Sequence, residues 1–194
     1  MALTFVTGNN KKLREFQAIV QDPTILHQKI DVDEIQGSIE AISIRKAQAA
    51  AEIVKGPVLV DDSCVIFNAL SKPGIGLPGP YIKFFMDSLG ADGLARLLDG
   101  FEDKSAKAVC TFAFCEGPGM DVKLFQGAVD GSIASEPRFG EGGGQFGVDA
   151  VFVPNGYDLT YSEMKQEMKN RISERSKALQ LVKEFLESRK EVIV

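Results

Sequence analysis

The sequence predicts an α/β fold, because short apolar runs of strand length alternate with segments in which apolar residues recur at helical spacing. A strand over 3–6 leads through a polar turn into a helix on which Leu13, Phe16 and Val20 share one face. We find no internal repeat and no linker composition in the chain. We therefore predict a single domain over 1–194.

The organising element is an apolar run at 58–60, which predicts a buried central strand. This strand is expected to end at Asp61, Asp62 and Ser63, and ligands bind at strand ends in open α/β sheets. Because consecutive side chains of a strand point to opposite faces, Asp61 and Asp62 are expected to meet different partners. A plain turn is the competing interpretation, since Asp and Ser often end strands.

The other elements follow from the same patterns. We predict two antiparallel strands that form a hairpin around a Gly-Pro-Gly turn, and a further strand that pairs in hairpin-like fashion with the central one. The expected helices are 39–54, 81–89, 94–98, 161–169 and 173–188, and the expected further strands are 65–67, 106–115, 122–132 and 151–153.

Composition excludes several classes of function. A net charge of −5 argues against a dedicated nucleic-acid or membrane-surface binder, which would need a basic patch. No apolar run approaches membrane-spanning length, and the first residues lack the charged segment of a signal peptide. Cys64, Cys110 and Cys115 are an odd number in apolar settings, which indicates reduced core thiols and a cytoplasmic location.

His27 is the single histidine, and this limits the chemistry. A His-rich zinc site is excluded, and a Ser-His-Asp triad would have to use that residue. Its place in a strand-like segment favours a structural role. The remaining polar chemistry must come from carboxylates, lysines and arginines, which suit magnesium and phosphate.

The turn over 7–12 is the first candidate for phosphate binding. Asn9 or Asn10 can cap the helix that follows, and a helix start after a glycine turn attracts anions. Lys11 and Lys12 are unfavourable beside the positive helix end unless an anion lies there. A solvated helix start is the alternative, and the spacing is not that of a Walker A loop.

Several stretches taken together resemble the inosine triphosphate pyrophosphatase family, in its eukaryotic branch. The similarity runs nearly end to end and is carried by separate motifs in the family's order. They are TGNNKK at 7–12, VDDS at 60–63, LPGPYIK at 77–83, GFEDKS at 100–105, FGVD at 146–149, YSEM at 161–164 and KN at 169–170.

The resemblance implies a long mixed sheet flanked by helices, with two lobes around a nucleotide cleft. It implies a homodimer that hydrolyses the purine nucleoside triphosphates ITP, dITP and XTP to the monophosphate and pyrophosphate. The implied cofactor is Mg²⁺, with Mn²⁺ as a substitute. It implies neither a nucleic-acid partner nor a membrane partner.

The family's functional residues carry over by position. Lys12 would be the main charge on the triphosphate, and Glu34 and Asp62 would ligate the metal. Asp62 would also orient or deprotonate the attacking water, so Asp62 and Lys12 are the predicted catalytic residues. The further predicted substrate contacts are Thr7, Gly8, Asn9, Asn10, Lys11, Lys46, Lys83, Phe146 stacked on the base, Gly147, Val148, Asp149, Lys169, Ser173, Glu174 and Arg175, the last at the 6-keto oxygen.

Two residues depart from the family pattern near the predicted base pocket. Glu174 stands where the family has histidine, and Val148 replaces an aromatic residue. Glu174 is either a solvated residue of a first helical turn or an acceptor for the N1–H of the base. A related house-cleaning pyrophosphatase with altered base selectivity is therefore an alternative. A non-catalytic nucleotide-binding paralogue is another, against which the retained phosphate and metal positions argue.

Overall fold

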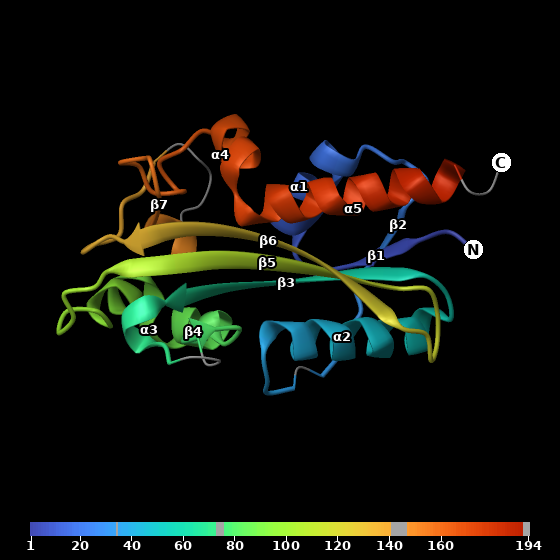
Figure 1. Cartoon of the computed structure of the whole chain (residues 1–194), viewed down its shortest axis with the longest axis horizontal. Helices are drawn as coiled ribbons and strands as arrows, with labels where there is room; N and C mark the ends of the chain where they lie inside the picture. Colours follow the sequence, from blue (N-terminus) through green and yellow to red (C-terminus); the bar gives the residue numbers. More distant parts are fainter. Residues whose placement is uncertain (34, 73–75, 141–146, 192–194) are drawn as a thin grey trace. The chain divides into compact units, whose positions relative to one another are not determined.

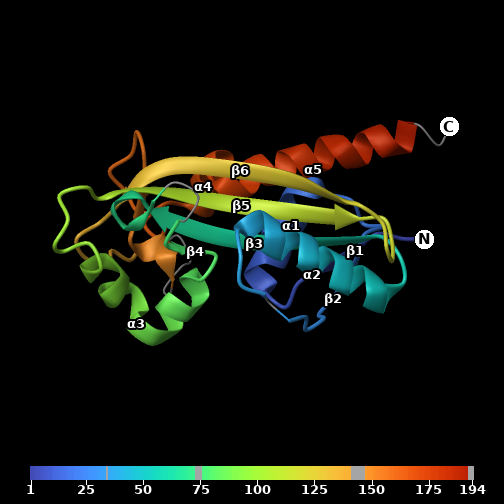
Figure 2. The same ribbon diagram turned by 60° about the horizontal axis from the view of Figure 1, so that its bottom comes forward.

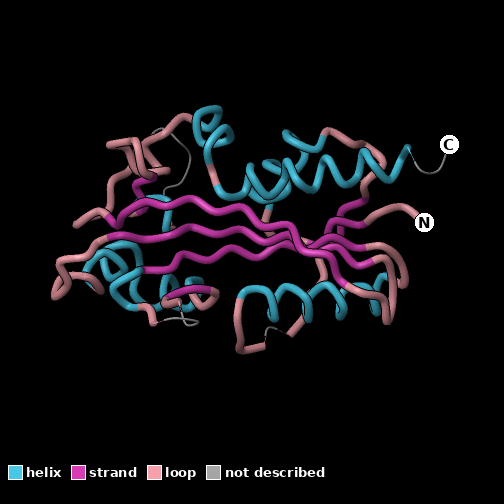
Figure 3. The backbone as a smooth tube through the Cα atoms, viewed as in Figure 1, coloured by secondary structure: helices cyan, strands magenta, loops and turns pink. Residues whose placement is uncertain are grey.

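The computed structural model describes residues 1–33, 35–72, 76–140 and 147–191. Its strands form a seven-stranded sheet in the order β2-β1-β3-β5-β6-β7, with β4 paired to β3 (Figures 1 and 3). The strands are β1 (Thr4–Val6), β2 (Leu26–Gln28), β3 (Val58–Phe67), β4 (Pro78–Gly79), β5 (Ser105–Cys115), β6 (Val122–Ile133) and β7 (Phe152–Pro154).

The sheet is mixed, as the family resemblance implies. β1 lies parallel to both β2 and β3, with Phe5 opposite His27 on one side and Leu59 on the other. β4 is antiparallel to β3, and β7 is antiparallel to β6. β5 and β6 are neighbours that run in opposite directions and are joined by a tight turn (Figure 2). The mixed α/β architecture is therefore confirmed.

The chain divides into two compact units. Unit 1 comprises Met1–Asp62, Cys110–Gly127 and Arg175–Val194, and unit 2 comprises Ser63–Val109 and Ala128–Glu174. One unit boundary falls inside each of the strands β3, β5 and β6. These three strands therefore contribute residues to both units.

Unit 1 packs helices on both faces of its part of the sheet. Helices α1 (Asn10–Val20) and α5 (Glu174–Glu191) lie on one face, and α2 (Ile39–Val54) lies on the other (Figure 1). Phe5, Phe16, Leu59 and Leu179 belong to the buried cluster on the α1 and α5 face. On the other face, the small buried side chains Ala47, Ala50 and Ala51 of α2 let that helix approach the strands closely.

Unit 2 has its own core, which includes Phe67, Leu94, Leu98, Phe152 and Met164. Its helices are α3 (Ile82–Arg96) and α4 (Gln166–Ile172), with short 3₁₀ turns η1 (Asn68–Leu70) and η2 (Val148–Ala150). Gly90 interrupts α3 with a φ of 65°, a left-handed conformation that suits glycine. Two helical segments thus lie on either side of Gly90 within α3, as predicted, although the second ends at Arg96 and not at Leu98.

Two predictions about local structure are wrong. The strand predicted at 58–60 does not end at Asp61, because β3 continues to Phe67 and includes the segment predicted as its hairpin partner. The helix predicted over 161–169 begins at Gln166, since 161–164 form a turn. The helix predicted over 39–54 has the bounds of α2. The three cysteines are buried and unbonded to each other, as expected.

No helix within the described ranges is long and apolar enough to cross a membrane.

Candidate active site

The turn after β1 is fixed by its own polar groups. The Asn9 side chain caps α1 by accepting hydrogen bonds from the backbone N–H groups of Lys11 and Lys12, at 2.9 and 3.3 Å. The hydroxyl of Thr7 accepts from the backbone N–H of Asn9 at 3.2 Å. Nε2 of His27 lies 2.8 Å from the carbonyl oxygen of Thr7, which agrees with the structural role predicted for this histidine. The predicted phosphate loop therefore contains a helix start that is capped by its own side chains.

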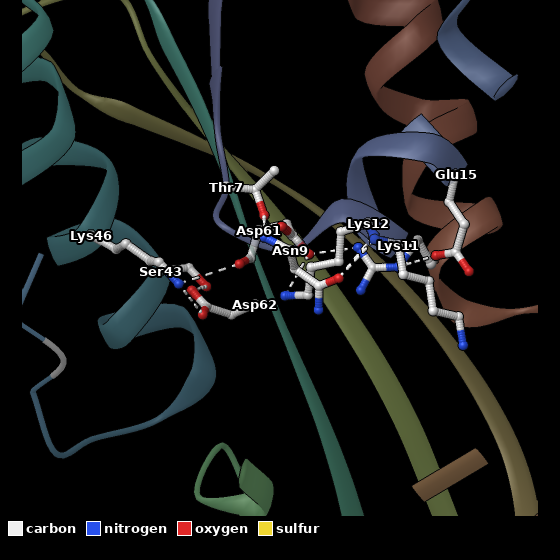
Figure 4. Close-up of polar contacts among 10 residues, drawn as sticks. Thr7, Asn9, Lys11, Lys12, Glu15, Ser43, Lys46, Asp61 and Asp62 are labelled. Carbon is white, nitrogen blue, oxygen red and sulfur yellow. Dashed lines mark hydrogen bonds and ion pairs between the residues drawn. The ribbon is translucent and has the colours of Figure 1, made fainter. Parts of the chain in front are cut away.

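Asp61 lies at the centre of a buried charge cluster in unit 1 (Figure 4). Its Oδ2 is 2.9 Å from Nζ of Lys12 and 2.5 Å from a terminal nitrogen of Arg175. Nε of Arg175 is in turn 2.9 Å from Oε2 of Glu15. The Asp61 side chain is 1% exposed, whereas that of Lys12 is 22% exposed. The Lys12 ammonium is thus held at the edge of the cluster, where an incoming anion can reach it.

The charges around Asp61 decide its protonation state. Burial alone would raise the pKa of Asp61, but the Lys12 ammonium and the Arg175 guanidinium hold this pKa well below its ordinary value. Burial would lower the pKa of Arg175, but its neighbours Cys110, Asp61 and Glu15 together raise this pKa above its ordinary value. At neutral pH Asp61 is therefore an anion that contacts two cations.

Asp62 has a different environment on the opposite side of β3. Its Oδ1 accepts from Nζ of Lys46 at 2.7 Å, and its Oδ2 accepts from the hydroxyl of Ser43 at 3.3 Å (Figure 4). Nζ of Lys46 also lies 3.4 Å from the carbonyl oxygen of Asp61. The side chains of Asp62 and Lys46 are 15% and 18% exposed. The predicted division of Asp61 and Asp62 between two sets of partners is confirmed.

Burial raises the pKa of Asp62, and the ammonium of Lys46 only partly offsets this. A carboxylate with a raised pKa is a stronger base than its unburied counterpart. The two adjacent aspartates thus differ in chemistry. Asp61 is a buried anion paired with Lys12 and Arg175, whereas the carboxylate of Asp62 could accept a proton or bind a cation.

A second polar set belongs to unit 2. Nζ of Lys169 lies 2.6 Å from Oδ2 of Asp149 and 4.9 Å from the centre of the Tyr161 ring. The hydroxyl of Tyr161 donates to Oε2 of Glu174 at 3.0 Å. Asp149, Lys169 and Glu174, which are all predicted substrate contacts, are thus linked to one another through Tyr161. The sequence analysis assigned no role to this tyrosine.

The described residues contain no group of three or more His, Cys, Asp or Glu side chains that could hold a metal ion. Mg²⁺ does not need such a cage, since one or two carboxylates and substrate phosphates hold it in many sites. The partly exposed carboxylate of Asp62 fits that requirement. Glu34, the other predicted ligand, lies outside the described residues.

The remaining predicted substrate contacts lie at the ends of helices and in turns, apart from one that is outside the described residues. Lys83 is exposed in the first turn of α3, and Ser173 is buried at the end of α4, where its N–H donates to the carbonyl of Lys169. Gly8 and Asn10 are exposed at the start of α1, and Gly147 and Val148 adjoin Asp149 at η2. Phe146 lies outside the described residues. Arg175, predicted to reach the 6-keto oxygen, has Asp61 and Glu15 as partners, and its contact with a base stays a prediction.

Sequence reasoning missed three polar residues of these clusters, namely Glu15, Ser43 and Tyr161. A signal for two of them exists, because Glu15 follows Lys12 by three residues on α1 and Lys46 follows Ser43 by three on α2. Residues at this spacing share a helix face. No comparable signal marks Tyr161, whose place beside Lys169 depends on tertiary packing.

Comparison with known proteins identifies similar chains over nearly the full length. A model of the Ham1 family matches residues 3–185. The inosine triphosphate pyrophosphatase of Yarrowia lipolytica is 52% identical over 194 residues, which cover 98% of both chains. The protein of the same name from Candida albicans is 47% identical over 204 residues, covering 95% of this chain and 97% of the relative.

Solved structures are also similar to this chain over nearly its full length. A HAM1 protein from Coxiella burnetii has a TM-score of 0.84 at 26% identity, covering 97% of this chain and all of that one. A nucleoside-triphosphatase, also named dITP/XTP pyrophosphatase, from Mycobacterium abscessus has a TM-score of 0.72 at 26% identity, covering 94% and 98% of the two chains.

Proposed function

The chain belongs to the Ham1 family, and from this premise we propose that it hydrolyses the deaminated purine nucleoside triphosphates ITP, dITP and XTP to the monophosphate and pyrophosphate. The observation that carries the proposal is the Asp62 carboxylate, placed between Lys46 and Ser43 in a chain about half identical to named inosine triphosphate pyrophosphatases. Such hydrolysis removes damaged nucleotides from the free pool and needs no nucleic-acid partner.

Lys12 and Lys46 would bind the triphosphate. Each ammonium is partly exposed and each is held by a carboxylate, so each charge is in place before the substrate arrives. Preorganised charge is the main catalytic resource in phosphoryl transfer, where the protein mostly positions groups and neutralises charge. The capped start of α1 adds the positive end of a helix beside Lys12.

Asp62 would orient the attacking water and accept its proton. Its raised pKa and its fixed contacts with Lys46 and Ser43 suit a general base. Asp61 would not compete for this role, because its carboxylate is buried, its Oδ2 contacts Lys12 and Arg175, and these cations hold its pKa low.

Mg²⁺, with Mn²⁺ as a substitute, is the proposed cofactor, and Asp62 and Glu34 would hold it. Charge supports this assignment: three cations, Lys12, Lys46 and Arg175, are matched in the clusters by three carboxylates, so the clusters have little net charge with which to neutralise a triphosphate. Bound Mg²⁺ supplies that charge and lowers the pKa of a coordinated water.

The protein is proposed to act in the cytoplasm as a homodimer. The family resemblance motivates the dimer, and the buried, unbonded cysteines are typical of a reducing compartment. Light scattering coupled to size exclusion checks the dimer directly. The expected mass is twice that of the 21.1 kDa chain, and a single-chain mass at micromolar concentration contradicts it.

A triphosphate panel tests the activity. Purified protein with Mg²⁺ is given ITP, dITP, XTP, GTP and ATP, and pyrophosphate and orthophosphate are measured separately. Pyrophosphate is expected as the first product from ITP, dITP and XTP, because attack is at the α-phosphorus. Orthophosphate as the first product rejects the reaction proposed here, and binding of ITP without hydrolysis favours a nucleotide sensor.

The same assay tests the role of Asp62. Asp62→Asn removes a base and a metal ligand with little change of shape, so turnover should fall by a factor of roughly 10² or more. Asp158→Asn makes the same change at an exposed position and serves as the control. Equal activity of native protein and Asp62→Asn would remove Asp62 from the reaction.

A further inference from the structure

We propose that Glu174 is a positioning residue, which acts through Tyr161 to hold the ammonium of Lys169 beside Asp149. This inference rests on the proposed function and on the predicted contact between Lys169 and the nucleotide. It gives Glu174 a role inside the protein rather than against the base.

Tyr161 is the link in this chain of contacts. It is 2% exposed, and its ring packs against Phe152 with ring centres 5.1 Å apart. Its hydroxyl donates to Oε2 of Glu174 at 3.0 Å. Burial, followed by the negative charge of Glu174, raises the pKa of Tyr161, so the phenol keeps its proton and remains a donor at neutral pH.

Glu174 therefore fixes the orientation of the tyrosine ring. A buried hydroxyl needs a hydrogen-bond partner, and a carboxylate is a strong acceptor. The ring is already confined by Phe152, so the hydrogen bond sets the tilt of its far end. Without an acceptor at position 174, the hydroxyl would be left buried and unsatisfied, or the ring would turn to find another partner.

The ring in turn limits where the Lys169 ammonium can lie. Nζ is 4.9 Å from the ring centre, within the range of a cation–π contact, and 2.6 Å from Oδ2 of Asp149. The Lys169 side chain is only 9% exposed. A lysine side chain normally samples many rotamers, and these two contacts restrict it before any ligand binds.

The functional consequence concerns substrate affinity more than the chemical step. A preplaced ammonium binds an anionic ligand without a further loss of rotamer freedom. Weakening the support should therefore raise KM and leave kcat nearly unchanged, which is the pattern of an interaction equally strong in the ground state and the transition state.

The first test measures the position of Lys169 without using activity. Native protein is treated with an amine-reactive reagent, and modification at Lys169 is followed by mass spectrometry. Labelling should be slow in the native chain and faster in Glu174→Ala and in Tyr161→Phe. Glu174→Gln, whose amide oxygen can still accept from the phenol, should label slowly. Tyr157→Phe and Glu187→Ala change exposed residues of the same types and should behave as native.

The second test measures kinetics on ITP and GTP with the same variants. Glu174→Ala and Tyr161→Phe should each raise KM about three- to tenfold, the equivalent of one lost hydrogen bond, with kcat within about twofold. The double variant should lose no more than either single one, since both break the same contact. The rise should be equal for ITP and GTP. A change in the ratio of the two efficiencies would mean that Glu174 contacts the base.

The outcomes separate this inference from the proposed function. If native protein hydrolyses no triphosphate while Lys169 labelling is still faster in Glu174→Ala, the proposed hydrolysis is rejected and the positioning role of Glu174 is supported. If labelling of Lys169 is the same in native protein, Glu174→Ala and Tyr161→Phe, the positioning role is overturned whatever the activity. Faster labelling with an unchanged KM overturns the effect on substrate.

Discussion

Adjacent residues of one strand acquire opposite roles because of the partners that each face supplies. Asp61 meets Lys12 and Arg175, and its pKa is lowered despite full burial. Asp62 meets Lys46 and Ser43; burial raises its pKa, and the Lys46 ammonium offsets this only in part. The same side chain thus becomes a structural anion at one position and a reactive carboxylate at the next. The difference comes from the alternation of a strand and not from residue type.

The first prediction concerns the stability that Asp61 contributes. Asp61→Asn leaves two cations beside a buried neutral side chain, and breaking a buried pair in this way costs about 3–5 kcal/mol. Urea unfolding at neutral pH should show that loss. Asp130→Asn, which changes an exposed carboxylate paired with Lys107 at 3.5 Å, should cost less than about 1 kcal/mol.

The pH dependence of unfolding gives the sign of this effect. Because the folded pKa of Asp61 lies below its ordinary value of 3.8, its contribution is fully present above that value and is lost as the pH falls through the folded pKa. The difference in unfolding free energy between native protein and Asp61→Asn should therefore shrink on acidification below about pH 4. A difference that grows on acidification would show that Asp61 is not a stabilising anion.

The second prediction concerns the charge of Lys12. Lys12→Ala should raise KM for ITP, because the variant lacks an ammonium at the capped start of α1. Added salt screens an interaction of this kind. The KM of the variant divided by the KM of native protein should therefore decrease as the ionic strength is raised. Lys55→Ala removes an exposed lysine that pairs with Glu52 and serves as the control. A KM equal to the native value at low salt would exclude Lys12 from the site.

At the scale of elements, local signals predicted most of the fold. The alanine-rich spacing over 39–54 gave the bounds of α2, and the Gly-Pro-Gly turn marked the junction of β5 and β6. These features depend on neighbours in sequence: period, caps and turn residues. Elements whose bounds depend on such local signals can therefore be located without knowledge of the tertiary structure.

The failures have a common physical cause. Two carboxylates in sequence predict the end of a strand, yet β3 continues because cations from distant segments compensate them. The hydrogen bond between Arg175 and Asp61 spans 114 residues of sequence, and no local pattern can indicate it. The turn at 161–164 has apolar residues at helical spacing, but Tyr161 and Met164 are buried by the unit 2 core and not by a helix face.

The third prediction concerns how α5 is attached to the β5–β6 turn region. The guanidinium of Arg189 pairs with both carboxylate oxygens of Glu116, one at 2.8 Å, and lies 4.8 Å from the centre of the Phe114 ring. Arg189→Ala should cost about 1 kcal/mol and speed amide exchange in the last turns of α5, with little change elsewhere. Arg189→Lys should recover part of the loss, because an ammonium keeps the charge but lacks the bidentate fork. Unchanged exchange in α5 would show that the contact anchors nothing.

At the scale of the molecule, the two compact units share their strands. The boundaries at 62/63, 109/110 and 127/128 fall within β3, β5 and β6, and no connecting segment has the composition of a linker. Each of these three strands has one part in unit 1 and the other part in unit 2, so neither unit has a complete copy of any of them. We therefore keep the prediction of one domain over 1–194, with two cores that fold together.

The last prediction is that both units unfold in a single transition, and the residue types supply a separate probe for each. Tyr81, Tyr157 and Tyr161 all lie in unit 2 and the chain has no tryptophan, so tyrosine fluorescence reports unit 2. Cys110 and Cys115 are buried in unit 1, so their modification by a thiol reagent reports unit 1. Across a urea series, the fluorescence change and the pulse labelling of these cysteines should have the same midpoint, because coincident transitions are the mark of two-state unfolding. Midpoints that differ beyond the error of the fits would show that β3, β5 and β6 break in the middle and that each unit is a domain of its own.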